Sequence, residues 1–134
     1  RSKRDGKKLF DDYCKKNGTK FISHKLPNIF GPGAKPNFTS FIATFCYNIH
    51  NNIECEYNKN VVKLCFVDDA IKVIAKLSWE NVKFDYVKVS VYEVYFLLKE
   101  FKKNIKNIDK LKSYKNFNKN LLVTFLSYKN YKIK

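Results

Sequence analysis

The sequence contains no methionine, a single tryptophan and, among its 27 basic residues, only two arginines, Arg1 and Arg4. Because the chain opens on Arg1 and offers no methionine at which translation could begin, we expect a piece of a longer protein. No apolar run approaches the roughly 20 residues that span a bilayer, and no signal-peptide pattern opens the chain. We therefore expect neither a membrane protein nor a secreted precursor.

Cysteine and histidine are also scarce. The four cysteines, Cys14, Cys46, Cys55 and Cys65, lie far apart without a C-x-x-C pair, and only two histidines accompany them. Such spacing matches neither a zinc site nor the disulfide framework of a small secreted domain. The sequence thus predicts that the thiols are reduced, that the location is cytoplasmic and that there is no metal site.

What the chain has in excess is lysine. Its formal net charge is +15, 25 of the 27 basic residues are lysines, and eleven of these lie in the last 36 residues. Arginine, whose planar fork suits phosphates and base edges, is almost absent. We therefore favour a solvated lysine surface and expect no specific nucleic-acid partner. A lysine-rich nucleic-acid-binding module stays open as an alternative, as does a small interaction domain without a ligand.

The 134 residues, 45% hydrophobic and 16% aromatic, suffice for one modest domain with a real core. Periodicity predicts helices over residues 2–16, 38–49, 68–77, 90–103 and 117–128, and strands over residues 19–26, 61–67 and 86–89. Ser90 with Glu93 has the form of a capping box, and Asp68 is placed to cap its helix. Residues 27–37 hold three prolines and two glycines and predict an ordered loop, whereas residues 104–116 predict a polar surface connection. This order suits a single α/β domain over residues 1–134.

The most informative segment is Lys25-Leu26-Pro27-Asn28-Ile29-Phe30-Gly31-Pro32. It predicts a strand that runs into a turn-rich loop at the carboxyl edge of the sheet, where open α/β sheets bind ligands. An ordinary strand end, in which the prolines only fix a turn, is the alternative. The two aspartates Asp68 and Asp69 are better explained as a helix cap and a surface carboxylate than as catalysts.

This segment resembles the R-x-x-N-V-Y-G-P loop of the extended short-chain dehydrogenase/reductases, the NAD-dependent epimerase/dehydratase family. The opening helix, with Lys3 and the pair Gly6-Lys7, is similar to the end of that family's Y-x-x-x-K helix. Later segments resemble one subgroup, the bifunctional reductases of capsule and O-antigen synthesis that make the UDP-N-acetyl-L-fucosamine precursor. They are Lys35-Pro36-Asn37 with Ala43-Thr44-Phe45-Cys46-Tyr47-Asn48-Ile49, then Phe66-Val67-Asp68-Asp69, then Thr124-Phe125-Leu126-Ser127-Tyr128.

The resemblance implies an α/β fold in which this chain is the C-terminal portion of a Rossmann-type domain, on its substrate-binding side. It also implies NADP or NAD as cofactor and a UDP-sugar as substrate, and it leaves a homodimer of the parent enzyme open. Lys3 matches the motif lysine, which holds the nicotinamide ribose and depresses the pKa of a tyrosine one helical turn earlier. Pro27 matches the position that packs on the nicotinamide. Asn28 matches a substrate-binding position, and Lys35 and Asn37 are expected to face the nucleotide sugar.

The chain also departs from the family pattern. The tyrosine would lie four residues before Lys3, outside the chain, and the N-terminal dinucleotide-binding part with its glycine-rich loop is missing. Lys25 stands where the family usually has arginine, and the 134 residues include no cupin domain such as the bifunctional relatives carry. The resemblance therefore implies hydride transfer to a keto-sugar in the parent enzyme and an inactive chain on its own. A nucleotide-sugar 4-epimerase or dehydratase of the same superfamily is the sister alternative.

Overall fold

A computed structural model describes residues 2–76 and 82–132. The elements follow one another as α1 (Ser2–Lys16), β1 (Asn28–Phe30), α2 (Phe41–His50), β2 (Val61–Phe66), α3 (Val67–Ala75), β3 (Val87–Ser90), α4 (Val91–Asn104), α5 (Ile108–Lys112) and α6 (Asn116–Ser127). This mixture confirms the predicted α/β class. Within the described ranges, no helix has the length and apolar character that a bilayer crossing requires.

The three strands form one sheet in the order β1-β2-β3. The first pair is parallel, with Asn28 opposite Leu64, and the second is antiparallel, with Val61 opposite Ser90. Successive residues of β2 point to opposite faces of the sheet, as the period of two in a strand requires. Leu64 and Phe66 pack with the helices α2, α4 and α6, whereas Cys65 packs with Ala70 and Phe84 on the opposite face.

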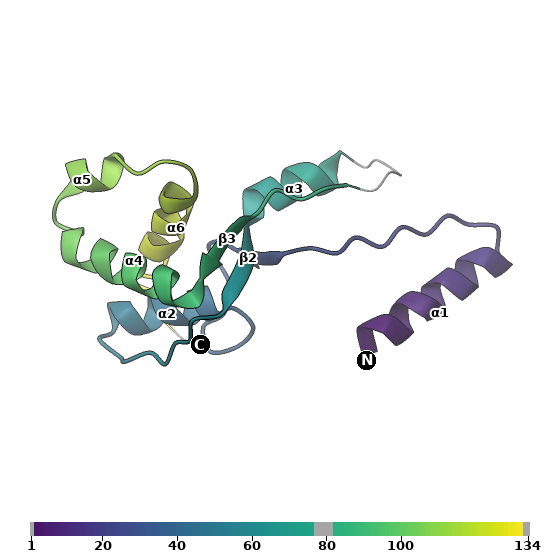
Figure 1. The fold of residues 1–134 in the computed structure, drawn as a ribbon, viewed down its shortest axis with the longest axis horizontal. Coiled ribbons are helices and arrows are strands. Elements are labelled where there is room, and N and C mark those ends of the chain that lie inside the picture. Colours follow the sequence, from purple (N-terminus) through teal and green to yellow (C-terminus); the bar gives the residue numbers. More distant parts are fainter. Residues whose placement is uncertain (1, 77–81, 133–134) are drawn as a thin grey trace.

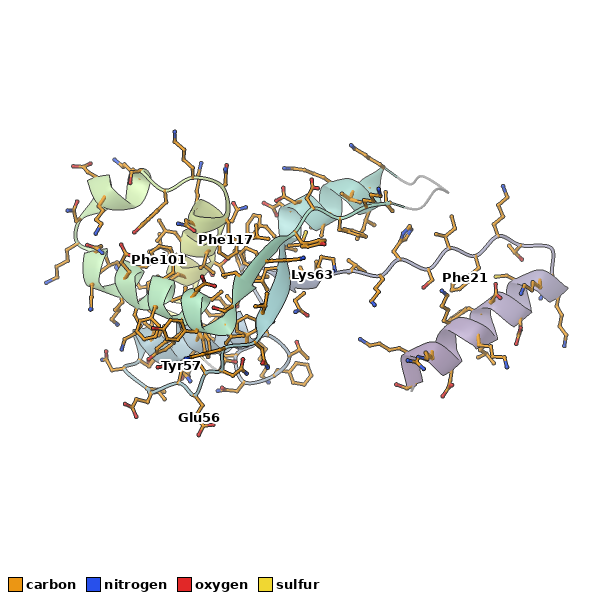
Figure 2. All side chains as sticks on the ribbon, viewed as in Figure 1. Phe21, Glu56, Tyr57, Lys63, Phe101 and Phe117 are labelled. Carbon is orange, nitrogen blue, oxygen red and sulfur yellow. The ribbon has the colours of Figure 1, made fainter. Side chains whose placement is uncertain are left out.

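The main core lies between the sheet and the helical layer of α2, α4 and α6. Its aromatic rings meet in edge-to-face and tilted pairs, arrangements that the ring quadrupoles favour over a face-to-face sandwich. The ring centroid of Phe30 lies 5.6 Å from that of Phe117, and that of Phe101 lies 6.1 Å from that of Phe125. Phe101 and Phe117 are labelled within this region in Figure 2. The core therefore joins β1, the strand that carries Asn28, to the C-terminal helix.

The predicted capping box is confirmed. The Ser90 hydroxyl accepts the Glu93 backbone N–H at 3.1 Å, and the Glu93 carboxylate accepts the Ser90 backbone N–H at 2.8 Å. The Ser90 hydroxyl also donates to this carboxylate at 2.7 Å, and this bond, followed by the one from the Ser90 backbone N–H, lowers the pKa of Glu93. The start of α2 lies three residues later than predicted, because the Ser40 hydroxyl accepts the Ala43 N–H and caps the helix there. Phe38, predicted on the apolar helix face, is consequently 79% exposed.

The predicted strand over residues 19–26 is wrong in the structure. These residues run as an extended connection between α1 and β1 without pairing, and the strand lies at Asn28–Phe30, inside the predicted loop. A strand needs a neighbour to complete its ladder, and residues 19–26 have none in the part of the chain that the structure describes. In Figure 1 the helix α1 stands apart from the body, beside this connection. Phe10 stacks on Phe21 at 5.7 Å, and most of the apolar face of α1 is exposed.

The predicted cap at Asp68 is also wrong. Strand β2 runs directly into α3, so Phe66 holds the N-cap position and Asp68 lies inside the first helical turn. Asp69, in the same turn, pairs with Lys72 at 3.4 Å. The predicted end of this helix at Leu77 lies outside the described residues, which give the helix as far as Ala75.

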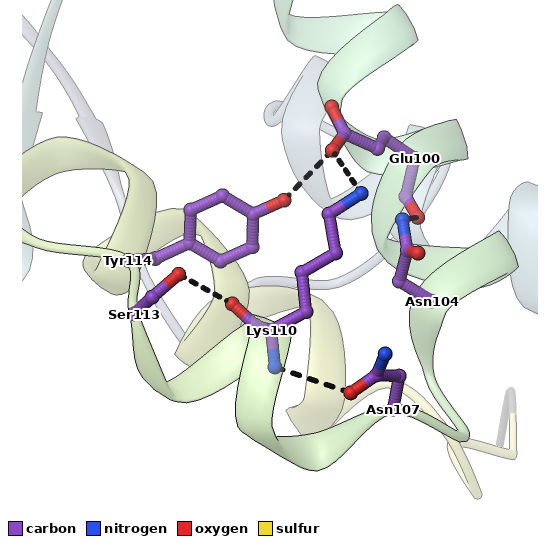
Figure 3. A network of polar contacts seen from close by, with 6 residues as sticks. All are labelled: Glu100, Asn104, Asn107, Lys110, Ser113 and Tyr114. Carbon is purple, nitrogen blue, oxygen red and sulfur yellow. Dashed lines mark hydrogen bonds and ion pairs between the residues drawn. The ribbon is translucent and has the colours of Figure 1, made fainter.

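The connection over residues 104–116 contains the short helix α5, which the sequence did not predict. Figure 3 shows how it is tied to α4 through the carboxylate of Glu100. That carboxylate accepts the Tyr114 hydroxyl at 2.9 Å and pairs with the Lys110 ammonium at 3.5 Å. The Asn107 side chain accepts the Lys110 backbone N–H at 3.2 Å. These contacts join residues that are close in sequence. We therefore interpret them as local surface structure and not as a functional site.

Candidate functional site

A small cavity of about 180 Å³ opens beside the start of β1. Asn28 lines it from the strand, and the loop that precedes α2 lines it with Thr39 and Ser40. The floor is apolar, formed by Ile29, Phe41, Ile42, Val62 and Leu64. An amide that can donate and accept therefore lines the same cavity as two hydroxyl-bearing residues and several apolar ones, which suits a small polyhydroxyl ligand.

The loop between β1 and α2 is fixed at several points. Gly31 packs so closely on Val67 that a Cβ at this glycine would overlap the valine side chain. The Tyr128 hydroxyl donates to the Ala34 carbonyl at 2.6 Å, and the Asn37 N–H donates to the Thr44 hydroxyl at 2.9 Å. These three contacts come from the β2–α3 junction, the end of α6 and the helix α2. The loop is thus held by the body of the domain.

Lys35 and Asn37, predicted to face the nucleotide sugar, are exposed on this loop. Asn37 adopts a φ of 57°, a left-handed conformation that asparagine tolerates better than most residues. Asn28, Lys35 and Asn37 therefore lie on one short segment, residues 28–37, and of these three residues Asn28 alone lines the small cavity. Their predicted contacts with a sugar stay a prediction.

Pro27 lies next to Asn28 in sequence but lines a different hollow, of about 430 Å³. That hollow is formed with Lys25, Lys63 and residues 82–86. Lys63, labelled in Figure 2, lies with its ammonium 4.7 Å from the centre of the Tyr86 ring. Pro27, predicted to touch the nicotinamide, and Asn28, predicted to touch the sugar, thus line two different hollows although they are neighbours in the chain.

Lys3 is exposed near the start of α1, and the structure does not bring it together with Pro27 or Asn28. Figure 1 shows α1 joined to the body through the extended connection. Its predicted role beside the tyrosine and the ribose therefore stays a prediction.

A third hollow, of about 420 Å³, lies where β2 ends, between β3 and α6. Its polar groups are the carboxylates of Asp69 and Asp85 and the amides of Asn116 and Asn120. Sequence reasoning did not group these residues, because they come from three separate segments, α3, the residues before β3 and α6, and share no motif. It also missed Thr39, whose position beside Asn28 only the fold reveals.

The fit to a nicotinamide dinucleotide is partial. In the Rossmann fold a glycine-rich loop lets the backbone approach the pyrophosphate at a helix N-terminus. Here Gly31 instead packs on Val67. The helices α2, α3, α4 and α6 follow Ser40, Phe66, Ser90 and Lys115, and α1 and α5 are described from Ser2 and Ile108. These residues do not form a pyrophosphate cradle. Among the described residues, no three histidine, cysteine or acidic side chains are grouped to hold a metal ion.

A comparison with known protein families identifies the family of this chain. The model of the NAD dependent epimerase/dehydratase family matches residues 1–87, more than half of the chain. The chain therefore belongs to this family, whose enzymes use a nicotinamide dinucleotide.

Two relatives are more specific. The chain is 36% identical over 55 residues to the UDP-2-acetamido-2,6-beta-L-arabino-hexul-4-ose reductase of Pseudomonas aeruginosa, a match that covers 40% of this chain and 15% of the relative. The crystal structure of the capsular polysaccharide assembling protein CapF from Staphylococcus aureus superposes with a TM-score of 0.77 at 33% identity. That match covers 95% of this chain and 38% of CapF. A second CapF structure, with the inhibitor 3-isopropenyl-tropolone, gives a TM-score of 0.75 at 32% identity, over 91% of this chain and 38% of CapF. The chain thus spans well under half the length of these relatives.

Proposed function

We propose that this chain is the substrate-side part of an NAD(P)-dependent reductase of a UDP-linked 6-deoxy-4-keto-N-acetylhexosamine. The observation that carries this proposal is the cavity beside β1, which Asn28 lines together with Thr39 and Ser40. The name of the Pseudomonas relative supports a UDP-linked hexulose as substrate, and the likeness to CapF supports a role in capsule synthesis.

In this proposal the residues of the chain bind and orient the sugar. The Asn28 amide and the Thr39 hydroxyl bind polar groups of the hexosamine, and Lys35 lies where its charge attracts the diphosphate. The nicotinamide dinucleotide, when bound, supplies the hydride. Lys3 and Pro27 contribute to its nicotinamide end only, because the pyrophosphate cradle is not formed by these residues. Holding the ketone in one orientation is itself a large part of the rate enhancement that such an enzyme needs.

A direct binding experiment tests the substrate side. UDP-N-acetylglucosamine is titrated into the 134-residue chain, and binding is followed by saturation-transfer NMR and calorimetry. We expect a specific complex that Asn28→Ala weakens by about tenfold, the effect of losing one or two good hydrogen bonds. Lys106→Ala, in the connection before α5, is the matched control and should bind as the unaltered chain does. Equal affinity for the Asn28 variant would remove the observation on which the proposal rests.

The catalytic side is tested in a protein that carries this chain together with the residues that precede it in the family. There Lys3→Met should lower turnover by about 100-fold or more and move the pH optimum upward. Asn28→Ala should instead weaken turnover of the keto-sugar with cofactor affinity nearly unchanged. An unaltered turnover and pH profile in Lys3→Met would show that the lysine is an ordinary surface residue. Product analysis separates this reductase from the sister 4-epimerase or dehydratase, since only the reductase consumes NAD(P)H stoichiometrically.

A further inference from the structure

We propose that Tyr128 is a positioning residue, whose hydroxyl holds the loop over residues 31–37 in the conformation that binds the nucleotide sugar. This inference rests on the proposed function and adds to it a residue that does not line the cavity. It starts from one contact that joins the end of α6 to the loop after β1.

The contact is short and buried. The Tyr128 hydroxyl donates to the Ala34 backbone carbonyl at 2.6 Å, across 94 residues of sequence. Tyr128 is 1% exposed, and burial raises its pKa to about 12. The phenol therefore keeps its proton at every pH at which the protein would work, so the donor is permanent.

The far end of the same loop has its own anchor. The Asn37 N–H donates to the Thr44 hydroxyl at 2.9 Å, and this hydroxyl donates in turn to the Ser40 carbonyl at 3.0 Å. Between the two anchors, Pro36 is fully buried, whereas Lys35 is exposed. Lys35 and Asn37 thus lie on a stretch of chain that hydrogen bonds hold on both sides. A stretch that is already held loses less conformational entropy when it binds a ligand.

The packing of the Tyr128 ring and the hydrogen bond of its hydroxyl can be tested separately. Its ring belongs to the main core and lies 5.3 Å from the ring of Tyr131. Phenylalanine would fill the same space and keep this packing, so Tyr128→Phe removes only the bond to Ala34. Tyr131→Phe is the matched control, since it removes a neighbouring hydroxyl in the same aromatic group.

The experiment combines two measurements on the 134-residue chain. Hydrogen exchange of the backbone amides of residues 33–37 should quicken by about tenfold in Tyr128→Phe, the effect of one buried hydrogen bond. The dissociation constant for UDP-N-acetylglucosamine should rise by a similar factor, and Tyr131→Phe should change neither quantity. Thr44→Val should act like Tyr128→Phe, and Thr44→Ser, which keeps the hydroxyl, should restore the behaviour of the unaltered chain.

The outcomes distinguish this inference from the proposed function. If the unaltered chain binds the probe and Tyr128→Phe binds it equally well, Tyr128 is a core residue and the positioning role is overturned. If exchange in the loop is unchanged in Tyr128→Phe, the inference fails whatever the affinity. If the unaltered chain does not bind the probe, the proposed function is overturned, and the exchange comparison still decides whether Tyr128 holds the loop.

Discussion

The close approach of Gly31 to Val67 leads to a prediction that can be worked out from the structure. A Cβ at Gly31 would overlap Val67 Cγ1 and lie 3.1 Å from Val67 Cβ and 3.6 Å from Phe66 Cε2. The valine is partly buried against the core and joins β2 to α3, so it cannot simply turn away. Gly31→Ala should therefore cost about 1–3 kcal/mol of unfolding free energy, the usual range for overpacking.

The assay is urea unfolding followed by far-UV circular dichroism for Gly31→Ala, Val67→Ala and the double variant. Val67→Ala removes the Cγ1 methyl that the new Cβ would overlap and leaves only the 3.1 Å approach to the Cβ at position 67, so the double variant should be more stable than the sum of the single effects predicts. We expect a coupling of about 1 kcal/mol or more, the size found between residues in contact. Gly6→Ala is the control, because nothing lies within 4 Å of a Cβ there and alanine favours a helix. Additive effects within about 0.5 kcal/mol would refute the steric explanation.

Two further predictions concern charge. Burial lowers the pKa of His50, with smaller effects of the same sign from Lys102 and Lys129, while its bond to the Phe125 carbonyl opposes them. The unfolded chain takes up this proton first, so the unfolding free energy should be constant above about pH 7 and fall below about pH 6.5. Urea titrations from pH 8 to pH 5 should show this loss and His50→Gln should flatten it; an equal loss in that variant would assign it to other groups. If the lysines only solvate the surface, DNA or RNA should bind weakly, without sequence preference, and binding should vanish with added salt. Sequence-selective, sub-micromolar binding that persists at about 200 mM salt would favour the nucleic-acid alternative instead.

Local signals in the sequence predicted the helices well. The capping box at Ser90 depends on residues three apart, and α4 begins where it predicts. The strands were harder to place. Residues 19–26 have the composition of a strand, whereas Asn28–Phe30 lies among prolines and glycines, and yet only the latter pairs with a neighbour. Composition reports the preference of a segment, but pairing depends on whether another strand lies beside it.

The candidate site was predictable only in part, and for a similar reason. Asn28, Lys35 and Asn37 could be named because they stand in a recognisable motif. Thr39 could not, since it has no motif, and its place in the cavity follows from the turn that Ser40 imposes before α2. The bond from Tyr128 to Ala34 was equally hidden, because periodicity along one helix says nothing of a contact 94 residues away.

The contacts that hold the proposed sugar-binding loop come from α2, α6 and the β2–α3 junction, all within the body of the domain. None of them involves α1, which carries Lys3 and stands apart in Figure 1. Substitutions at Tyr128 or Thr44 should therefore act on affinity for the nucleotide sugar, whereas a substitution at Lys3 should act on turnover. Under the proposed function, orientation of the substrate would thus depend on this body, whereas the chemical step would also need Lys3 on α1.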